Sequence, residues 1–141
     1  MATKTAFVKN IEGVTFIGKA DSKHWVTMDG PEDFGGSNAG TRPKELILLA
    51  LGGCTGSDVA VILKKKKIKY DKFEMNISAE QQEVHPQVYT KIHIEFVFHG
   101  NGIPKEAVER AIELSQKTYC SVTAMLQNSV EITHSYKIIG D

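Results

Sequence analysis

The most informative stretch of this chain is Arg42-Pro-Lys-Glu-Leu-Ile-Leu-Leu-Ala-Leu-Gly-Gly-Cys-Thr-Gly-Ser-Asp58. Pro43 is favoured at the first position of a helix, so a helix is predicted to begin here and to run to about Lys66. The segment from Leu46 to Leu51 is apolar nearly all round. We therefore expect a long central helix that is buried on several sides.

Cys54 falls in the middle of this predicted helix, between Gly52-Gly53 and Thr55-Gly56. Each glycine weakens a helix by about 1 kcal/mol relative to alanine. A sequence normally carries that loss where another backbone or a ligand must approach closely. Two interpretations stay open: Cys54 is a small buried apolar side chain beside glycines that allow tight packing, or it is a reactive thiol.

The second cysteine of the chain is Cys120, which precedes a predicted short helix from Ser121 to Gln127. Unpaired N–H groups and the helix dipole at such a position favour a thiolate, although a buried thiol is the simpler interpretation. Since the chain has two cysteines, the question is whether they meet, one as the attacking thiol and the other as the resolving thiol.

The remaining elements follow from hydrophobic periodicity and turn signals. Strands are predicted at Thr5 to Lys9, Val14 to Gly18, His24 to Met28, Phe73 to Glu80, Ile92 to His99 and Val130 to Ile138. Residues 29–41 read as a loop, and a helix beginning at Pro104 carries an inner stripe of Ala107, Val108, Ala111, Ile112 and Ser115. Strands and helices come in blocks, which favours an α+β fold.

Composition narrows the class of protein. A chain of 141 residues fits a single domain over residues 1–141. Its 17 basic and 17 acidic residues balance, which argues against a nucleic-acid partner.

No signal peptide is recognisable, and the apolar run from Leu46 to Leu51 is too short to span a membrane. We therefore expect the protein to be cytoplasmic. In the reducing cytoplasm, a transient disulfide is more plausible than a structural one. The histidines show no metal-ligand spacing with the cysteines.

A family resemblance rests on the two cysteine segments. Pro43-Lys-Glu45-Leu46 leads to Gly53-Cys54, and Tyr119-Cys120-Ser-Val-Thr-Ala-Met-Leu126 follows about 66 residues after Cys54. This pattern resembles the OsmC/Ohr family of osmotically inducible and organic hydroperoxide resistance proteins, and most of all its OsmC-like branch. The resemblance covers nearly the whole chain, including the predicted order of elements.

The resemblance implies a thiol peroxidase that acts in defence against oxidative stress. Cys54 would attack an organic hydroperoxide, with hydrogen peroxide as a further candidate substrate, and become a sulfenic acid. Cys120 would resolve it as a disulfide, and a dithiol reductant of the lipoyl type would restore both thiols. The resemblance also implies an intertwined homodimer with its sites at the subunit interface, and no metal, flavin or haem cofactor.

The activating residues depart from the family pattern. Hydroperoxide-specific relatives pair the reactive cysteine with an arginine and a glutamate, and the glutamate follows the proline directly. Lys44 stands at that place here, and Glu45 comes one residue later, about 100° further round the helix. No arginine precedes Arg42. Arg42 and Glu45 are therefore the candidate activating residues, with Lys44 as another cation that could lower a thiol pKa.

Lys44 and Glu45 precede Cys54 by about ten positions and therefore lie roughly 15 Å from it along the predicted helix. A charged residue that acts on the Cys54 thiol is thus expected to come from a partner subunit. Two other functions stay open: a non-catalytic dimer that binds a small apolar ligand, and a redox sensor whose disulfide changes its affinity for a partner.

Overall fold

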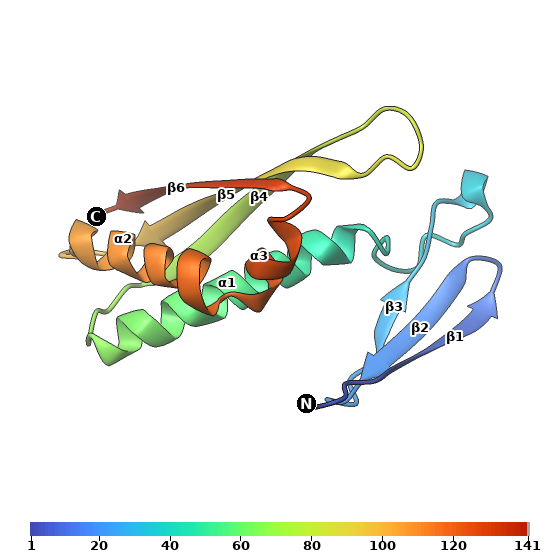
Figure 1. Cartoon of the computed structure of the whole chain (residues 1–141), viewed down its shortest axis with the longest axis horizontal. Coiled ribbons are helices and arrows are strands. Elements are labelled where there is room, and N and C mark those ends of the chain that lie inside the picture. The colour runs from blue at the N-terminus through green and yellow to red at the C-terminus, as the bar shows by residue number, and fades with distance from the viewer. Residues whose placement is uncertain (141) are drawn as a thin grey trace. The chain divides into compact units, whose positions relative to one another are not determined.

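The computed structural model describes residues 1–140, which fold as two compact units that divide after Leu48. Each unit contains a three-stranded sheet, and Figure 1 labels the elements of both. The α+β class and the predicted order of strands and helices are confirmed. The prediction of one domain over residues 1–141 stays a prediction.

The first unit is an antiparallel meander of β1 (Ala6–Glu12), β2 (Thr15–Ala20) and β3 (Val26–Met28). Direct pairing of Val8 with Gly18 and of Gly18 with Val26 places these residues on one face of the sheet. Phe16 and Met28 pair on the same face. This apolar face of the meander includes side chains that remain exposed, among them Val8 at 56% and Val26 at 43%.

The loop after β3 is held by Asp29, which is 1% exposed. Its carboxylate accepts hydrogen bonds from the Thr15 hydroxyl and from the backbone N–H groups of Gly30, Ser37 and Ala39. A single turn of 3₁₀-helix, η1 (Glu32–Phe34), lies within this loop. One buried carboxylate therefore organises a segment that sequence periodicity could not describe.

The second unit pairs β4 (Lys72–Gln81) antiparallel with β5 (Tyr89–His99), and β5 parallel with β6 (Glu131–Ile139). The parallel pairing requires a crossover, which α2 (Lys105–Leu114), η2 (Ser115–Tyr119) and α3 (Ser121–Leu126) provide. Figure 1 shows α1 (Glu45–Lys65) and α2 along one side of this sheet. The buried side chains of β5 include Ile92, Ile94, Phe96 and Phe98.

Two glycines of α1 allow the helix to lie close to the sheet. A Cβ atom at Gly52 would meet Ile77 Cδ1 at 2.6 Å, and one at Gly56 would meet Met75 Cε at 2.6 Å. Both contacting side chains project from β4. A Cβ atom at Gly53 would meet nothing within 4 Å. Close packing therefore accounts for Gly52 and Gly56 but not for Gly53.

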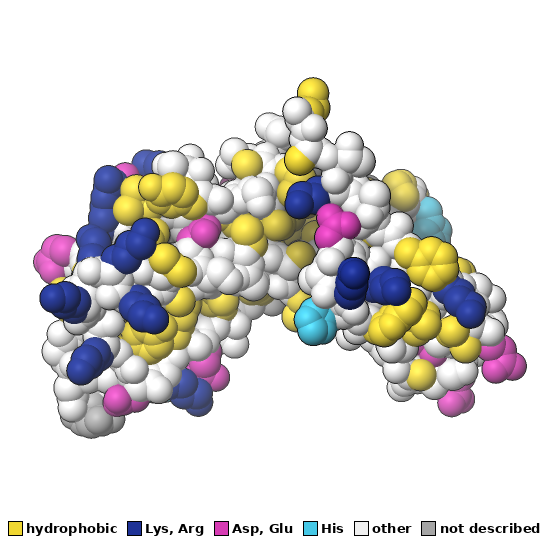
Figure 2. All heavy atoms as spheres, turned by 90° about the horizontal axis from the view of Figure 1, so that it is seen from below, with side chains coloured by type: hydrophobic (Ala, Val, Ile, Leu, Met, Phe, Trp, Pro, Cys, Tyr) yellow, Lys and Arg dark blue, Asp and Glu magenta, His cyan; other side chains and the backbone are white. Residues whose placement is uncertain are grey.

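The expectation that α1 is buried on several sides is wrong for the single chain. Its buried side chains Leu51, Thr55, Val59 and Leu63 recur every four residues along one stripe. Leu49 is 60% exposed and Val61 is 52% exposed. Figure 2 shows apolar side chains reaching the surface of the chain at several places. Although apolar residues surround much of α1, only one face of the helix is buried within the single chain.

Helix α1 also has the length and the mean hydropathy, 2.0, of a membrane-spanning helix. Core helices of globular proteins can have the same length and hydropathy. The close contacts of Gly52 and Gly56 with the sheet are typical of such a core helix. The predicted absence of a membrane span stays a prediction.

Candidate functional site

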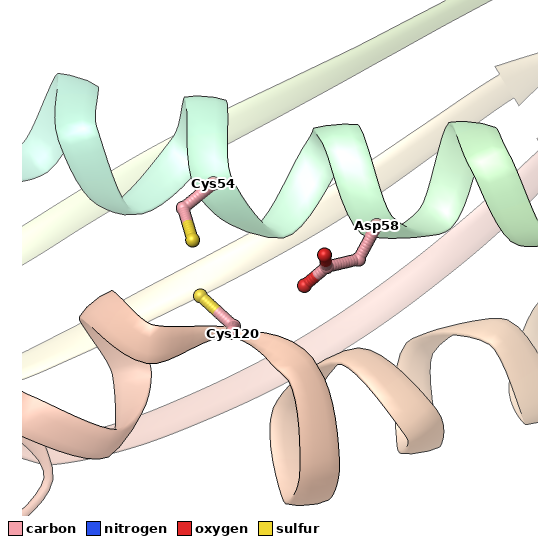
Figure 3. Close-up of side chains that lie close together, drawn as sticks. All are labelled: Cys54, Asp58 and Cys120. Carbon is pink, nitrogen blue, oxygen red and sulfur yellow. The ribbon is translucent and has the colours of Figure 1, made fainter.

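The two cysteines of the chain come together in the second unit. Cys54 projects from the middle of α1, and Cys120 lies between η2 and α3 (Figure 3). Their sulfur atoms and a carboxylate oxygen of Asp58 all lie within 4.8 Å of one another. The question raised by the sequence is therefore answered: residues 66 positions apart meet at one site.

A change of helix type positions Cys120. Helix α2 continues into the single π-helical turn η2, where the backbone N–H of Cys120 donates to the carbonyl of Ser115 at 2.8 Å. Cys120 itself is extended, with φ −75° and ψ 102°, and caps α3. Single π-turns of this kind are often found at functional sites. This turn separates α2 from α3.

Cys120 is 3% exposed and its sulfur is held by hydrogen bonds. The backbone N–H of Thr123 donates to Sγ at 3.4 Å, and Thr55 Oγ1 lies 3.4 Å from Sγ. Burial acts most strongly on the thiol and raises its pKa, but the hydrogen bonds from Thr123, Thr55 and Cys54 together outweigh it and lower the pKa of Cys120. The cap geometry that was predicted to favour a thiolate is present.

A side-chain network fixes the donors around Cys120. Gln116 Nε2 donates to Thr55 Oγ1 at 3.1 Å, which leaves the Thr55 hydroxyl proton free to point towards the sulfur. The Thr123 hydroxyl donates to Gln116 Oε1 at 3.2 Å. Because that single proton cannot serve two acceptors at once, the backbone N–H of Thr123 is the more constant donor to Cys120.

Cys54 has a more open setting than Cys120. Its side chain is half-buried, and its sulfur lies 3.9 Å from Ser121 Oγ at the start of α3. Gly53 beside it adds no side chain to the exposed surface of α1. A solute that approaches from outside reaches the Cys54 sulfur more readily than the buried sulfur of Cys120.

Asp58 is a site residue that sequence analysis missed. It follows Cys54 by four residues on α1, so both side chains lie on the same face of the helix. Ser115 Oγ donates to Asp58 Oδ2 at 2.9 Å and joins the carboxylate to the end of α2. The i, i+4 spacing of a thiol and a carboxylate was the signal that could have identified it.

Arg42 and Glu45 make local hydrogen bonds around the start of α1. Arg42 Nη1 donates to Asn38 Oδ1 at 2.8 Å and to the carbonyl of Gly40 at 3.3 Å. The backbone N–H of Arg42 donates to Glu45 Oε1 at 2.9 Å, which is one half of a capping box. A capping role thus accounts for both residues structurally, and their predicted roles in activating the thiol stay predictions.

A hollow with a volume of about 470 Å³ lies beside the thiol site in the second unit. It is lined by Ser57, Asp58, Val61, Ile62, Lys65, Lys66, Leu114 and Tyr119. Asp58 belongs to both the hollow and the thiol cluster. A small molecule that enters the hollow therefore comes close to the two sulfur atoms.

Comparison with known proteins identifies the protein family of this chain. The family described as OsmC-like protein matches residues 35–135, and the chain belongs to that family. The resemblance inferred from the two cysteine segments is confirmed.

Particular relatives agree with this family. Protein YhfA of Escherichia coli strain K12 is 38% identical over 138 residues, which are 96% of this chain and 98% of that protein. The crystal structure of a hypothetical protein from Aquifex aeolicus VF5 superimposes with a TM-score of 0.86 at 30% identity, covering 100% of this chain and 99% of that chain.

A more distant relative shows the fold alone. The structure described as an organic hydroperoxide resistance protein OsmC, predicted redox protein, from Legionella pneumophila has a TM-score of 0.70 at 14% identity. The match covers 97% of this chain and 98% of that chain.

Proposed function

We propose that this protein is a cysteine-based peroxidase that reduces organic hydroperoxides, with hydrogen peroxide as a further substrate. The observation that carries the proposal is the convergence of Cys54 and Cys120, whose sulfur atoms lie within 4.8 Å of each other. Membership of the OsmC-like family and the redox description of the Legionella relative support a peroxide-related role.

The first step uses Cys54 because its sulfur is the more accessible of the two. The Cys54 thiolate attacks the terminal oxygen of the hydroperoxide, the O–O bond breaks, and an alcohol leaves after taking up a proton. The sulfur is oxidised to a sulfenic acid while the peroxide is reduced. Ser121 Oγ, 3.9 Å from this sulfur, is the neighbouring hydroxyl available to the developing charge.

The second step uses Cys120, whose thiolate is favoured by its hydrogen bonds to Thr123 and Thr55. The thiolate attacks the sulfenic sulfur, an S–S bond forms, and hydroxide leaves as water after protonation. A disulfide requires an S–S distance of about 2.05 Å, so the sulfurs must approach by rotation of their side chains. A dithiol reductant of the lipoyl type then takes the disulfide back to two thiols.

The working form in this proposal is an intertwined homodimer in the cytoplasm. In such a dimer, the interface would cover the exposed apolar side chains of α1, Leu49 and Val61, and the apolar face of the meander. A charged group that activates Cys54 would come from the helix start of the second subunit, where Arg42 and Glu45 lie.

A peroxide-consumption assay tests the proposal, with cumene hydroperoxide as substrate and dihydrolipoamide as reductant. We expect the wild-type chain to turn over many times and Cys54→Ser to lose turnover while remaining folded. Cys120→Ser should undergo one oxidation and then accumulate sulfenic or over-oxidised Cys54, which mass spectrometry detects. Multiple turnover by either variant would exclude the two-cysteine mechanism.

The same assay separates the alternatives. Oxidation of one equivalent without turnover in the wild-type chain would favour a redox sensor. No reaction with free, accessible thiols would favour a protein that binds a small apolar ligand, with the hollow beside Asp58 as the place to look for it.

A further inference from the structure

We propose that the reduced chain binds one thiophilic divalent cation, of the Zn²⁺ or Cd²⁺ type, through Cys54, Cys120 and Asp58. The three side chains come from α1 and from the junction of η2 with α3 (Figure 3). Binding itself does not depend on peroxidase activity. Only the consequence for the peroxidase cycle, given below, rests on the proposed function.

The donor atoms select the class of cation. Two thiolates are soft ligands that favour Zn²⁺, Cd²⁺ and Cu⁺ over Mg²⁺ and Ca²⁺, and Zn²⁺ also accepts a carboxylate oxygen. Two thiolates and one carboxylate carry three negative charges when ionised, so a dication removes most of the repulsion between them.

The geometry is close to that of a metal site. A point equidistant from three atoms that lie within 4.8 Å of one another is at most about 2.8 Å from each of them. Since Zn–S and Zn–O bonds are about 2.3 Å and about 2.1 Å long, each donor must move inward by no more than about 0.5–0.7 Å. Rotation about side-chain torsions provides such a movement without a change in the backbone.

Neighbouring groups already orient the donors. Ser115 Oγ donates to Asp58 Oδ2 at 2.9 Å and leaves the second carboxylate oxygen for a cation. The N–H of Thr123 supports the sulfur of Cys120 at 3.4 Å. Hydrogen bonds to the side chains that ligate a metal tune its affinity in known sites.

The site also has an entrance and an open coordination position. Cys54 and Asp58 are half-buried rather than buried, and Asp58 lines the hollow beside the thiols. Three protein ligands leave the fourth tetrahedral position to water or to Ser121 Oγ, which lies 3.9 Å from the Cys54 sulfur. A cation can therefore enter without unfolding of the site.

Oxidation of the two thiols in the peroxidase cycle would release the bound cation. One hydroperoxide oxidises the two metal-bound thiolates to a disulfide, takes up two protons, and is reduced to an alcohol and water. The divalent cation leaves because a disulfide is no longer a thiolate ligand. The cation-bound state and the disulfide state thus exclude each other at this site.

Direct titration of the full-length reduced chain with Cd²⁺ tests the site, read by the thiolate-to-cadmium charge-transfer absorption and by calorimetry. We expect one equivalent per chain, with Zn²⁺ displacing Cd²⁺ in competition against a chromogenic chelator. Cys54→Ser and Cys120→Ser should lose the absorption band. Asp58→Asn keeps both thiols and the Ser115 hydrogen bond, and it should weaken binding by about tenfold or more.

Two controls make the result decisive. Asp21→Asn changes a carboxylate in the other unit and should leave the affinity unchanged. Wild-type chain that has been oxidised to its disulfide should bind no Cd²⁺. Absence of the absorption band in reduced wild type would overturn the proposal, as would an affinity insensitive to Asp58→Asn or binding that survives loss of either cysteine. Tight binding by a chain that fails the peroxidase assay would remove the proposed function and leave the metal site standing.

Discussion

The two units of this chain are both built on three-stranded sheets, yet they bury their apolar side chains very differently. Among the described residues, every buried apolar side chain lies at Leu51 or later in the chain. In the first unit the buried residues are Gly18 and Asp29, and β1 is exposed along its whole length. In the second unit, β5 carries buried side chains from Ile92 to Phe98.

An alternating sequence pattern therefore predicts a strand but not the element that covers it. The helices of the second unit come from the same chain and cover its sheet, so its alternating pattern is satisfied locally. A three-stranded meander without a covering layer is only marginally stable in water. The apolar face of the meander, with Val8 and Val26 exposed, therefore needs a surface outside its own unit, which the proposed homodimer would supply.

The largest expected effect comes from a charge on that apolar face. Val26→Asp should convert the dimer to a monomer or leave the first unit unfolded, because an unpaired carboxylate costs several kcal/mol when it is buried. Sedimentation or light scattering measures the assembly state. Thr27→Asp, on the opposite face of the same strand, is the matched control and should remain dimeric. A dimeric Val26→Asp protein with an intact first unit would break the comparison.

The next largest effect concerns the core of the second unit. Phe96 is fully buried, so Phe96→Ala should lower the free energy of unfolding by about 3–5 kcal/mol. Chemical denaturation followed by circular dichroism measures this loss. Val84→Ala, at a side chain that is 77% exposed, should change stability by less than about 0.5 kcal/mol. Equal losses at the two positions would contradict a core confined to the second unit.

Alanine substitutions at two adjacent glycines of α1 should change the free energy of unfolding in opposite directions. Gly52→Ala places a Cβ atom 2.6 Å from Ile77 and should cost about 1–3 kcal/mol through overpacking. Gly53→Ala meets nothing within 4 Å in the single chain and should add up to about 1 kcal/mol through helix propensity. Thermal unfolding distinguishes the two. Destabilisation by Gly53→Ala in the assembled protein would show that another surface approaches the helix there.

The smallest expected effect is a pH dependence of the first unit. Burial raises the pKa of Asp29, but hydrogen bonds from Gly30, Thr15, Ala39 and Ser37 outweigh it and hold the pKa below the ordinary value of 3.8. A carboxyl group with a lowered pKa in the folded state contributes stability above pH 3.8 and loses it as the pH falls through the folded pKa.

The fluorescence of Trp25, the single tryptophan of the chain, reports on this unit. We expect an acid transition below pH 3.8 that is weaker in Asp29→Asn, whose side chain cannot ionise. The matched variant Asp33→Asn changes a neighbouring exposed acid and should keep the wild-type transition. An unchanged transition in Asp29→Asn would mean that another group controls it.

Much of the fold could be predicted from residue patterns. Alternation from Phe73 to Glu80 and from Ile92 to His99 predicted β4 and β5, and Pro104 marked the start of α2 within one residue. The inner stripe of the helix predicted from Pro104 included Ser115, which is buried at the start of η2. These predictions succeed because side-chain periodicity is a property of a single element.

The site was predictable only in part. The two cysteines were identified from their local segments, but Asp58 was not, although its i, i+4 relation to Cys54 is visible in the sequence. The π-turn η2 that places Cys120 leaves no periodic signal. Whether α1 is covered on one face or on several could not be decided from its composition, because burial depends on what packs against it.

Residue patterns alone indicate the order of strands and helices, the position of the two thiols along them and membership of a family. The packing of the elements is needed to show that Cys54, Cys120 and Asp58 share one site and that Gly52 and Gly56, but not Gly53, serve packing. The physical reason is the range of the interactions. Spacing along one element is fixed by backbone geometry, whereas contacts between residues 66 positions apart depend on how whole elements pack.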